Sequence, residues 1–413
     1  MSAIRLVLTD PGLRAAAAMS FLLGAVACTF GPYVAQLAVQ HFALGDTGYA
    51  ALLALGTAVS VSAALYVGIR SDQTGRRRSL AVWAAALMVA AAALMTALPS
   101  PFSFILAHGL ILPMSSLFGQ IFALSRISAQ AQPEASRDGI LSTIRALFAL
   151  PFVVVLPLWS LAFRQGVALM TIYPVGLGLT LLMLLVAVLG WPADARLAPH
   201  AARSGLSVRA ALRELSHPAI TLRLMALGAV GSTGTVYWAV LSLVLTPANG
   251  RSAADVALYA GLVAGAEVPF MLALPWLCRG MSRPTAMLVG TCIYVIHLLG
   301  LPLLAPTPWL WLLVLPAAAG GAFILTLPIA YLQDLLSDRP GTGSALIAMQ
   351  KLTGDLIAAA CFALGTTLAG YGLVTVLGSG AAVLGALALV LADRRFVAAA
   401  GGRPPDPGDI SVE

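Results

Sequence analysis

Long apolar runs fill most of this chain, and they restrict its fold more than any other feature. Sixty per cent of its 413 residues are hydrophobic and only 9% are charged, whereas a soluble protein carries roughly 25% charged residues. So few charges cannot cover a water-facing surface, which excludes a secreted disulfide scaffold, a disordered chain and an ordinary cytosolic enzyme. Twelve membrane spans of about 20 residues would use about 240 positions. The composition therefore predicts a polytopic helical membrane protein.

Glycine, proline and charged residues divide the apolar runs into separate helices. The predicted helices cover residues 13–40, 48–69, 79–98, 102–124, 139–163, 166–190, 219–245, 253–277, 284–304, 309–332, 344–369 and 371–391. We therefore expect an all-α protein with twelve transmembrane helices.

Arginine placement predicts the orientation. If the N-terminus is cytoplasmic, most of the 23 lysine and arginine residues fall in inside segments. Arg164 and Arg251 would lie outside, and Arg145 and Lys351 lie within helices. Since short inside loops are enriched in basic residues, both termini are predicted to be cytoplasmic. The basic residues form no face or tail, so nucleic acid is not an expected partner.

The chain divides into two similar halves. The expected domains are an N-terminal six-helix bundle at 1–191, a cytoplasmic linker at 192–217, a C-terminal six-helix bundle at 218–392 and a disordered tail at 393–413. The fifth predicted helix places Arg145 about two turns inside, and the eleventh places Lys351 at a similar depth. Equivalent helices that each carry a buried cation indicate parallel repeats, hence two pseudo-symmetric bundles.

The loop between the second and third helices carries the most specific motif. It reads Gly68-Ile-Arg-Ser-Asp72-Gln-Thr-Gly75-Arg76-Arg77-Arg78. This sequence resembles the G-x-x-x-D-x-x-G-R-R/K loop of the major facilitator superfamily, at the place where that family has it. The resemblance implies two bundles that expose a midplane site to alternate sides of the membrane.

The same resemblance implies that this loop is a gate, a clamp holding the inner ends of the bundles together in one state. Glycine would let helix ends approach or turn the chain, and a carboxylate can meet a helix N-terminus or an arginine. The expected gating residues are Gly68, Asp72, Gly75, Arg76 and Arg77. The alternative is a basic cytoplasmic turn that only sets the topology.

Several further stretches are similar to the bacterial sugar efflux transporters, one branch of that superfamily. They are Phe21-Leu-Leu-Gly24 with Pro32, Arg70 to Leu80, Phe118 to Leu124, Gly265-Ala-Glu267-Val-Pro269, and Leu332-Gln-Asp-Leu335 leading to Pro340-Gly-Thr-Gly-Ser344. The resemblance implies export of sugars or small glycosides across a bacterial cytoplasmic (inner) membrane in exchange for protons. Two positions depart from the pattern: Leu156-Pro157 lacks the glycine of the Gly-Pro pair found in many proton-coupled exporters, and Lys351 replaces an arginine of the branch.

Ionisable residues inside the predicted spans are candidates for function, because each costs on the order of 2.5–3.5 kcal/mol at the midplane on insertion scales. Glu267, with Pro269 two residues on, could carry a proton or bind sugar hydroxyls; alternatively it is a structural acid with a permanent partner. Lys351 and Asp355 are four residues apart and can pair within one helix, and such a pair could serve only to lower the insertion cost. Proton coupling is expected at Glu267 and Asp355. Arg145 could bind substrate or extend to the interface.

Sugar recognition needs hydrogen-bonding groups and an aromatic face. The predicted substrate-binding residues are Tyr33, Gln36, Gln120, Arg145, Tyr237, Trp238, Glu267, Gln350 and Lys351. For each of these residues, helix packing or an interface belt is the alternative role. His108 and His297 are expected to be packed residues that hydrogen-bond a neighbouring helix.

Nothing in the sequence suggests catalysis. It has no Walker loop, no H-E-x-x-H motif and no C-x-x-C pair, so we expect no enzyme activity, no cofactor and no metal site.

The expected partners are a sugar or glycoside, protons and the lipid bilayer, with the protein acting as a monomer. Two alternatives stay open: a multidrug/proton antiporter of the same superfamily, and a membrane sensor that binds a ligand without moving it. Counterflow assays would separate the three.

Overall fold

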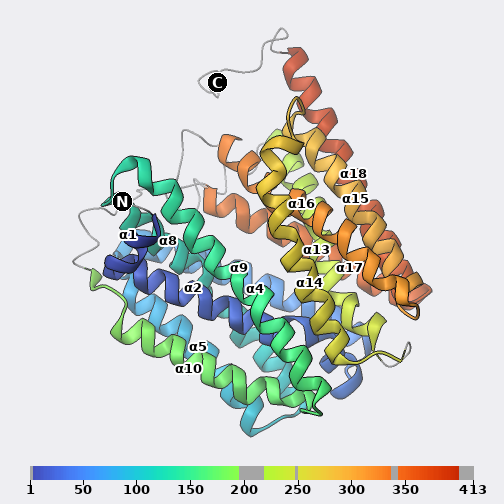
Figure 1. The fold of residues 1–413 in the computed structure, drawn as a ribbon, viewed down its shortest axis with the longest axis horizontal. Helices are drawn as coiled ribbons and strands as arrows, with labels where there is room; N and C mark the ends of the chain where they lie inside the picture. Colours follow the sequence, from blue (N-terminus) through green and yellow to red (C-terminus); the bar gives the residue numbers. More distant parts are fainter. Residues whose placement is uncertain (1–2, 195–217, 247–249, 336–342, 400–413) are drawn as a thin grey trace. The chain divides into compact units, whose positions relative to one another are not determined.

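The structure, a computed structural model, describes residues 3–194, 218–246, 250–335 and 343–399 (Figure 1). These residues form helices joined by short turns, and they include no strand. The chain forms two compact units, one made of Met1–Gly205 with Arg251–Ala264 and the other of Leu206–Gly250 with Gly265–Glu413. Most of the predicted linker and the end of the predicted tail lie outside the described residues.

Unit 1, the first of these, holds the elements up to α10. They are α1 (Ala3–Thr9), α2 (Pro11–Phe30), η1 (Gly31–Tyr33), α3 (Val34–Gln36), η2 (Leu37–His41), α4 (Gly45–Thr74), α5 (Arg77–Ala97), α6 (Pro101–Ile105), η3 (Leu106–Ile111), α7 (Leu112–Met114), α8 (Leu117–Gln130), α9 (Glu134–Arg164), η4 (Leu169–Thr171) and α10 (Ile172–Leu189).

Unit 2 holds the later elements. They are α13 (Pro218–Leu245), α15 (Arg283–Leu304), η6 (Pro308–Leu313), α16 (Val314–Leu335), α17 (Gly343–Leu368) and α18 (Tyr371–Ala399). The first half of α14 (Ala253–Leu277) belongs to unit 1 and its second half to unit 2. Helix α18 runs to Ala399, so it continues into the stretch that the sequence assigned to the tail.

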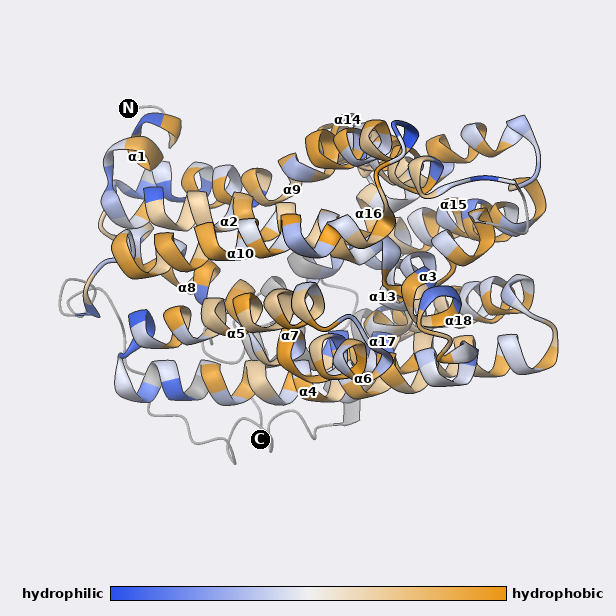
Figure 2. Cartoon of the chain, turned by 90° about the horizontal axis from the view of Figure 1, so that it is seen from below, coloured by the Kyte–Doolittle hydropathy of each residue, from blue (hydrophilic) through white to orange (hydrophobic). Residues whose placement is uncertain are grey.

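Twelve helical segments of the described chain are long and apolar enough to cross a membrane. They correspond one to one with the twelve predicted helices, so the all-α class and the helix count are confirmed. Figure 2 shows apolar residues along the lengths of these helices and hydrophilic residues mainly near their ends. The chain is a multi-pass membrane protein.

Local capping explains where several helices begin. Asp10 accepts a hydrogen bond from the Leu13 backbone N–H at 2.8 Å, and Pro11 follows it as the first residue of α2. Ser100 and Ser282 accept in the same way at the starts of α6 and α15. Short polar side chains at these positions satisfy backbone donors that the first helical turn leaves open.

Four of the predicted helices are divided into shorter segments, and in the sixth and tenth the division is only a short 3₁₀ segment, η4 or η6, before the α-helix. The first is interrupted at Gly31, Pro32 and Tyr33, because proline has no backbone N–H to continue the helical bonding. The fourth is interrupted at Ser116, whose φ of 43° is left-handed. A non-glycine residue in this conformation is strained. The conformational preferences of the residues around Ser116 did not predict this interruption.

Helix α2 lies beside α9 within unit 1 (Figure 1). The Ser20 hydroxyl donates to the Ile144 carbonyl oxygen at 2.9 Å, and the Trp159 indole N–H donates to the Thr29 hydroxyl at 3.2 Å. All four of these residues are buried. Two buried hydrogen bonds more than two turns apart therefore fix the register of this helix pair.

Helices α13 and α17 pack closely within unit 2. A Cβ atom added at Gly354 would lie 2.7 Å from the Gly228 carbonyl oxygen, so no larger residue fits there without a shift of the backbone. This close approach brings the polar residues of the two helices into contact.

Candidate functional site

The predicted gating loop joins α4 to α5. Gly75 adopts a φ of 67° and donates its N–H to the Ser71 carbonyl oxygen at 2.9 Å, which ends α4. The turn expected at this glycine is therefore confirmed. Arg76 is exposed and Arg77 is buried. The side chain of Asp72 lies outside the described residues, so its clamp role stays a prediction.

Gly68 was expected to allow the close approach of helix ends. A Cβ atom added at this position would meet no atom within 4 Å. The described residues thus place nothing against it, and its part in gating also stays a prediction.

An unpredicted contact joins the same loop to the end of α10. The Arg78 backbone N–H, in the first turn of α5, donates to the Asp194 carboxylate at 2.9 Å. The Arg78 guanidinium Nη2 donates to the Val188 carbonyl oxygen at 2.6 Å. A carboxylate at a helix N-terminus is favoured by the helix dipole. The partners are 116 residues apart, and no local pattern in the sequence could pair them.

Three predicted binding residues of unit 1 bury oxygen atoms without a partner. Tyr33 is 0% exposed and Gln120 is 4% exposed, whereas Gln36 is partly buried. Among the residues that the structure describes, none hydrogen-bonds the Tyr33 hydroxyl or the side-chain carbonyl oxygens of Gln36 and Gln120. The Tyr33 ring itself packs against Phe163, with 5.4 Å between centroids. A buried polar group left unpaired costs about 1–3 kcal/mol, so these atoms are the clearest candidates in unit 1 to bind a solute.

Arg145 lies within α9, as predicted, but its side chain is exposed and not buried. Within the described part of the chain it forms no hydrogen bond or ion pair. Lys351 is likewise exposed. The expectation of two buried cations is therefore wrong. The physical reason is that long basic side chains extend their charged ends away from the packed helix face.

The predicted pair in helix α17 is confirmed. The Lys351 Nζ lies 2.5 Å from Asp355 Oδ2, and the Thr235 hydroxyl of α13 donates to Asp355 Oδ1 at 2.6 Å. The Lys351 side chain is 60% exposed, whereas that of Asp355 is 9% exposed. A partly exposed cation is thus held by a buried carboxylate, which is itself fixed by a neighbouring helix.

Gln350 precedes Lys351 in the sequence, and its side chain also lies near helix α13. A Cβ atom added at Gly231 of α13 would lie 3.7 Å from its amide Nε2. The α13–α17 contact therefore gathers three predicted site residues, namely Gln350, Lys351 and Asp355.

Glu267 lies in α14 and is half-buried. Its carboxyl group lies over Gly321 of α16, where a Cβ atom would overlap Oε1. Among the described residues, none donates a hydrogen bond to this carboxyl group and none pairs with it. The described residues therefore do not supply the permanent partner that a purely structural acid would need, and Lys351 pairs with Asp355.

The predicted aromatic residues of unit 2 belong to one ring cluster. The Tyr237 ring lies 5.0 Å from Trp238 and 5.2 Å from His297, and Tyr294 also contacts His297. Tyr237 is buried and Trp238 is half-buried. This cluster joins α13 to α15 and provides both a packing core and one partly accessible indole.

His108 is a packed residue, as expected. Its Nε2 lies 3.0 Å from the Tyr173 hydroxyl oxygen, and Phe30 and Phe104 surround the ring. This hydrogen bond joins η3 to α10, so the prediction of a contact to a neighbouring helix is confirmed for this histidine.

A second ionic cluster of unit 2 was not predicted. The Tyr331 hydroxyl donates to Asp393 Oδ1 at 3.1 Å, and the Arg223 guanidinium lies 3.8 Å from the same oxygen. The phenol keeps its proton at neutral pH and donates it in a hydrogen bond to the carboxylate, which also lies near the guanidinium. The cluster ties together the ends of α13, α16 and α18.

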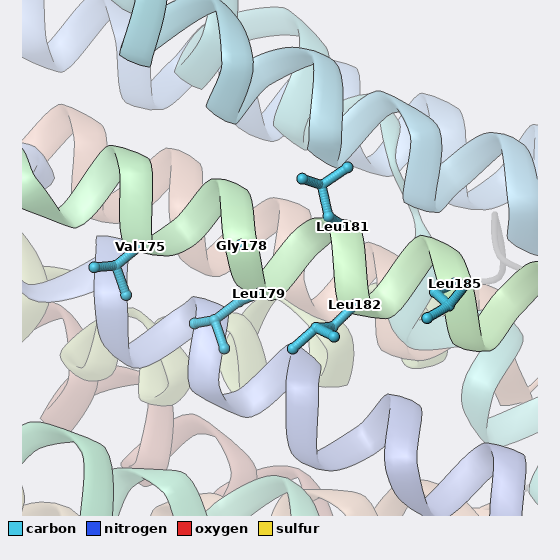
Figure 3. Close-up of a pocket in the computed structure, with 6 residues that line it drawn as sticks. All are labelled: Val175, Gly178, Leu179, Leu181, Leu182 and Leu185. Carbon is cyan, nitrogen blue, oxygen red and sulfur yellow. The ribbon is translucent and has the colours of Figure 1, made fainter.

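The hollow drawn in Figure 3 lies on α10 and has a volume of about 580 Å³. It is lined by Val175, Gly178, Leu179, Leu181, Leu182 and Leu185. In Figure 3 the Val175, Leu179 and Leu182 side chains point to one side of the helix and Leu181 to the other. A lining without polar groups cannot recognise a sugar, and it suits lipid chains. In the described residues, no group of three or more His, Cys, Asp or Glu is placed to hold a metal ion.

Comparison with solved structures shows which fold this is. The nucleoside transporter NupG matches with a TM-score of 0.73 at 13% identity, over 93% of this chain and 99% of that chain. A D-xylose-proton symporter matches with a TM-score of 0.69 at 15% identity, over 90% and 95% of the two chains. The human organic anion transporter MFSD10 (TETRAN) matches with a TM-score of 0.62 at 18% identity, over 92% and 100%. The chain has the fold of major facilitator superfamily transporters.

No family model matches the sequence, and no curated protein matches it. The similarity to the solved structures is therefore a similarity of fold, and the sugar efflux branch stays a prediction.

Proposed function

We propose that the protein is a secondary active transporter that exports sugars or small glycosides by alternating access, in exchange for protons. In this proposal it acts as a monomer in a bacterial cytoplasmic membrane, with both termini on the cytoplasmic side. The observation that carries it is the set of buried oxygens of Tyr33, Gln36 and Gln120, which have no hydrogen-bond partner among the described residues. The fold supports it, because two solved structures with this fold are a nucleoside transporter and a D-xylose-proton symporter.

Neutral amide and phenol groups suit an uncharged solute rich in hydroxyls. A polar group inside a membrane span has no water to bind, so it must find a partner in the protein or in a ligand. Sugar hydroxyls both donate and accept, and they can therefore satisfy a carbonyl oxygen and a phenol alike. An apolar solute would leave all three groups unpaired.

In unit 2 we propose the remaining predicted residues as substrate-binding residues. Gln350 and Lys351 would donate hydrogen bonds to solute hydroxyls, and Trp238, beside Tyr237, would offer an aromatic face. In unit 1, Arg145 would be a further donor. Because Lys351 is paired with Asp355, it would donate a hydrogen bond as a member of a pair that has no net charge.

Glu267 is the proposed proton carrier. A half-buried carboxyl group without a partner among the described residues can take up and release a proton with no described ion pair to break, whereas Asp355 would first have to lose Lys351. Asp355, which the sequence also suggested for coupling, is therefore the weaker of the two candidates. The loop with Gly68, Asp72 and Gly75 would act as the gate.

A multidrug/proton antiporter is the second candidate, and the same glutamate favours it. An unpartnered carboxylate in a membrane span attracts a cationic drug as well as a proton. The two candidates differ in what they need: a cationic drug should tolerate loss of the glutamines but not of Glu267, whereas a sugar carrier should lose affinity when Gln36 or Gln120 is replaced.

Counterflow in proteoliposomes tests the proposal. Separate batches would be preloaded with glucose, lactose, an alkyl glycoside and a cationic drug, and uptake of the labelled solute would be followed without a pH gradient. Counterflow with a sugar supports the proposal, and counterflow with the drug alone favours the antiporter. No counterflow by folded protein with any of the solutes would reject both.

A further inference from the structure

The contact between α13 and α17 contains one residue, Thr235, to which the transport proposal gives no role. Thr235 donates its hydroxyl to one carboxylate oxygen of Asp355, and Lys351 binds the other. Both oxygens of a buried carboxylate are therefore occupied, one by a neutral donor on another helix and one by a cation on its own helix.

The donor on α13 lies two turns from a close contact of the helix pair. At this contact the backbones of Gly354 and Gly228 approach so closely that a Cβ atom added at Gly354 would lie 2.7 Å from the Gly228 carbonyl oxygen. Asp355 follows Gly354 directly, and Thr235 lies two turns along α13 from Gly228. With Oδ1 of Asp355 bound by the Thr235 hydroxyl, the second carboxylate oxygen, Oδ2, is directed at Lys351.

We propose that Thr235 is a positioning residue: it fixes Asp355 as the standing counter-ion of Lys351, and the neutralised pair makes the site select uncharged solutes over anionic ones. A free Lys351 would attract a carboxylate or phosphate group. With its ammonium held by Asp355, it can only donate a hydrogen bond, and an anion brought beside it would also meet the charge of Asp355.

The selectivity half of this inference rests on the proposed transport function, whereas the positioning half does not. The sequence offers a direct assay for positioning, because Lys351 is the only lysine of the chain. An amine-reactive ester acylates Nζ only when the ion pair is open. The rate of acylation of the Lys351 peptide, followed by mass spectrometry, therefore reports how readily the Lys351–Asp355 ion pair opens. The N-terminal amine also reacts, but it lies on a different peptide and is measured separately.

The test compares Thr235→Val, which keeps the shape and removes the hydroxyl, with Thr235→Ser, which keeps the hydroxyl. We expect about tenfold faster acylation in Thr235→Val, which corresponds to about 1.4 kcal/mol, near the lower limit for a hydrogen bond to a charged group. Thr235→Ser should restore the wild-type rate, and Asp355→Asn should react faster than either. Thr235→Ala provides a second variant with the same expectation if Thr235→Val does not fold.

Thr233→Val is the matched control. Thr233 lies on the same helix, is fully buried, and donates to the Val230 carbonyl oxygen. Its replacement should leave the acylation rate of Lys351 unchanged. If Thr235→Val reacts at the wild-type rate, or if Thr233→Val accelerates the reaction equally, Thr235 does not position Asp355 and the proposal is overturned.

Glucose and glucuronate test selectivity, because they differ in a single charged group. The measurement is the glucuronate concentration that halves counterflow of labelled glucose. In the wild type glucuronate should not compete over the concentration range tested, and in Thr235→Val it should compete at concentrations at least about tenfold below the upper end of that range. Competition by glucuronate in the wild type equal to that of unlabelled glucose would overturn the selectivity and leave the positioning intact. Absence of counterflow with any sugar would reject the transport function, and the acylation rates would still decide the role of Thr235.

Discussion

Replacing Glu267 by glutamine tests the proposed proton coupling. Glutamine has the shape of glutamate but cannot carry a proton in this way, and the carboxyl group has no partner among the described residues to lose. Packing over Gly321 should therefore persist. If one proton exchanges for one sugar, a difference of one pH unit supplies about 1.36 kcal/mol and sustains about a tenfold sugar gradient.

The assay measures sugar accumulation in proteoliposomes under an imposed pH difference, alongside counterflow without one. Wild-type protein should reach about a tenfold ratio per pH unit, and Glu267→Gln should reach a ratio near one while counterflow continues. Glu134→Gln, at the exposed start of α9, is the control and should behave as wild type. Accumulation by Glu267→Gln at the wild-type ratio would refute the reasoning, because the proton would then be carried elsewhere.

Four further predictions follow from particular contacts. Gly321→Ala places a Cβ atom on the Glu267 carboxyl group, so pH-driven accumulation should fall while α16 stays folded by circular dichroism. Asp194→Ala removes the acceptor at the start of α5, which should cost about 1 kcal/mol and lower Tm by about 1 °C; an unchanged melting curve would show that the contact contributes nothing. Tyr33→Phe removes a buried hydroxyl without a described partner, so thermal stability should hold or rise while the KM for sugar rises about tenfold; an unchanged KM would exclude this hydroxyl from the site. Asp72→Asn should slow the transport cycle without changing which solutes compete in counterflow, and a changed solute list would contradict the gating role.

The sequence predicted what is decided locally. Hydropathy along single helices defined all twelve spans, because a span is a property of consecutive residues. The pairing of Lys351 with Asp355 was predictable for the same reason, since residues four apart share a helix face. The turn at Gly75 followed from the conformational freedom of glycine.

Contacts between distant segments were not predictable in this way. Thr235 meets Asp355 across 120 residues, and Arg78 meets Asp194 across 116. Only the packing of helix pairs brings these atoms together. The break at Ser116 was missed because serine carries no signal for a left-handed conformation, and the exposure of Arg145 depends on which face of α9 is packed.

The most direct test of the central claim is counterflow of a labelled sugar in proteoliposomes without a pH gradient. It measures alternating access to a sugar site and nothing else, so it does not depend on which residue carries the proton. The account predicts counterflow with glucose, lactose or the alkyl glycoside, with lower affinity in Gln120→Leu, because its buried amide would lose its hydrogen bond to the solute. Counterflow with the cationic drug alone, or with no solute by protein shown to be folded, would contradict it.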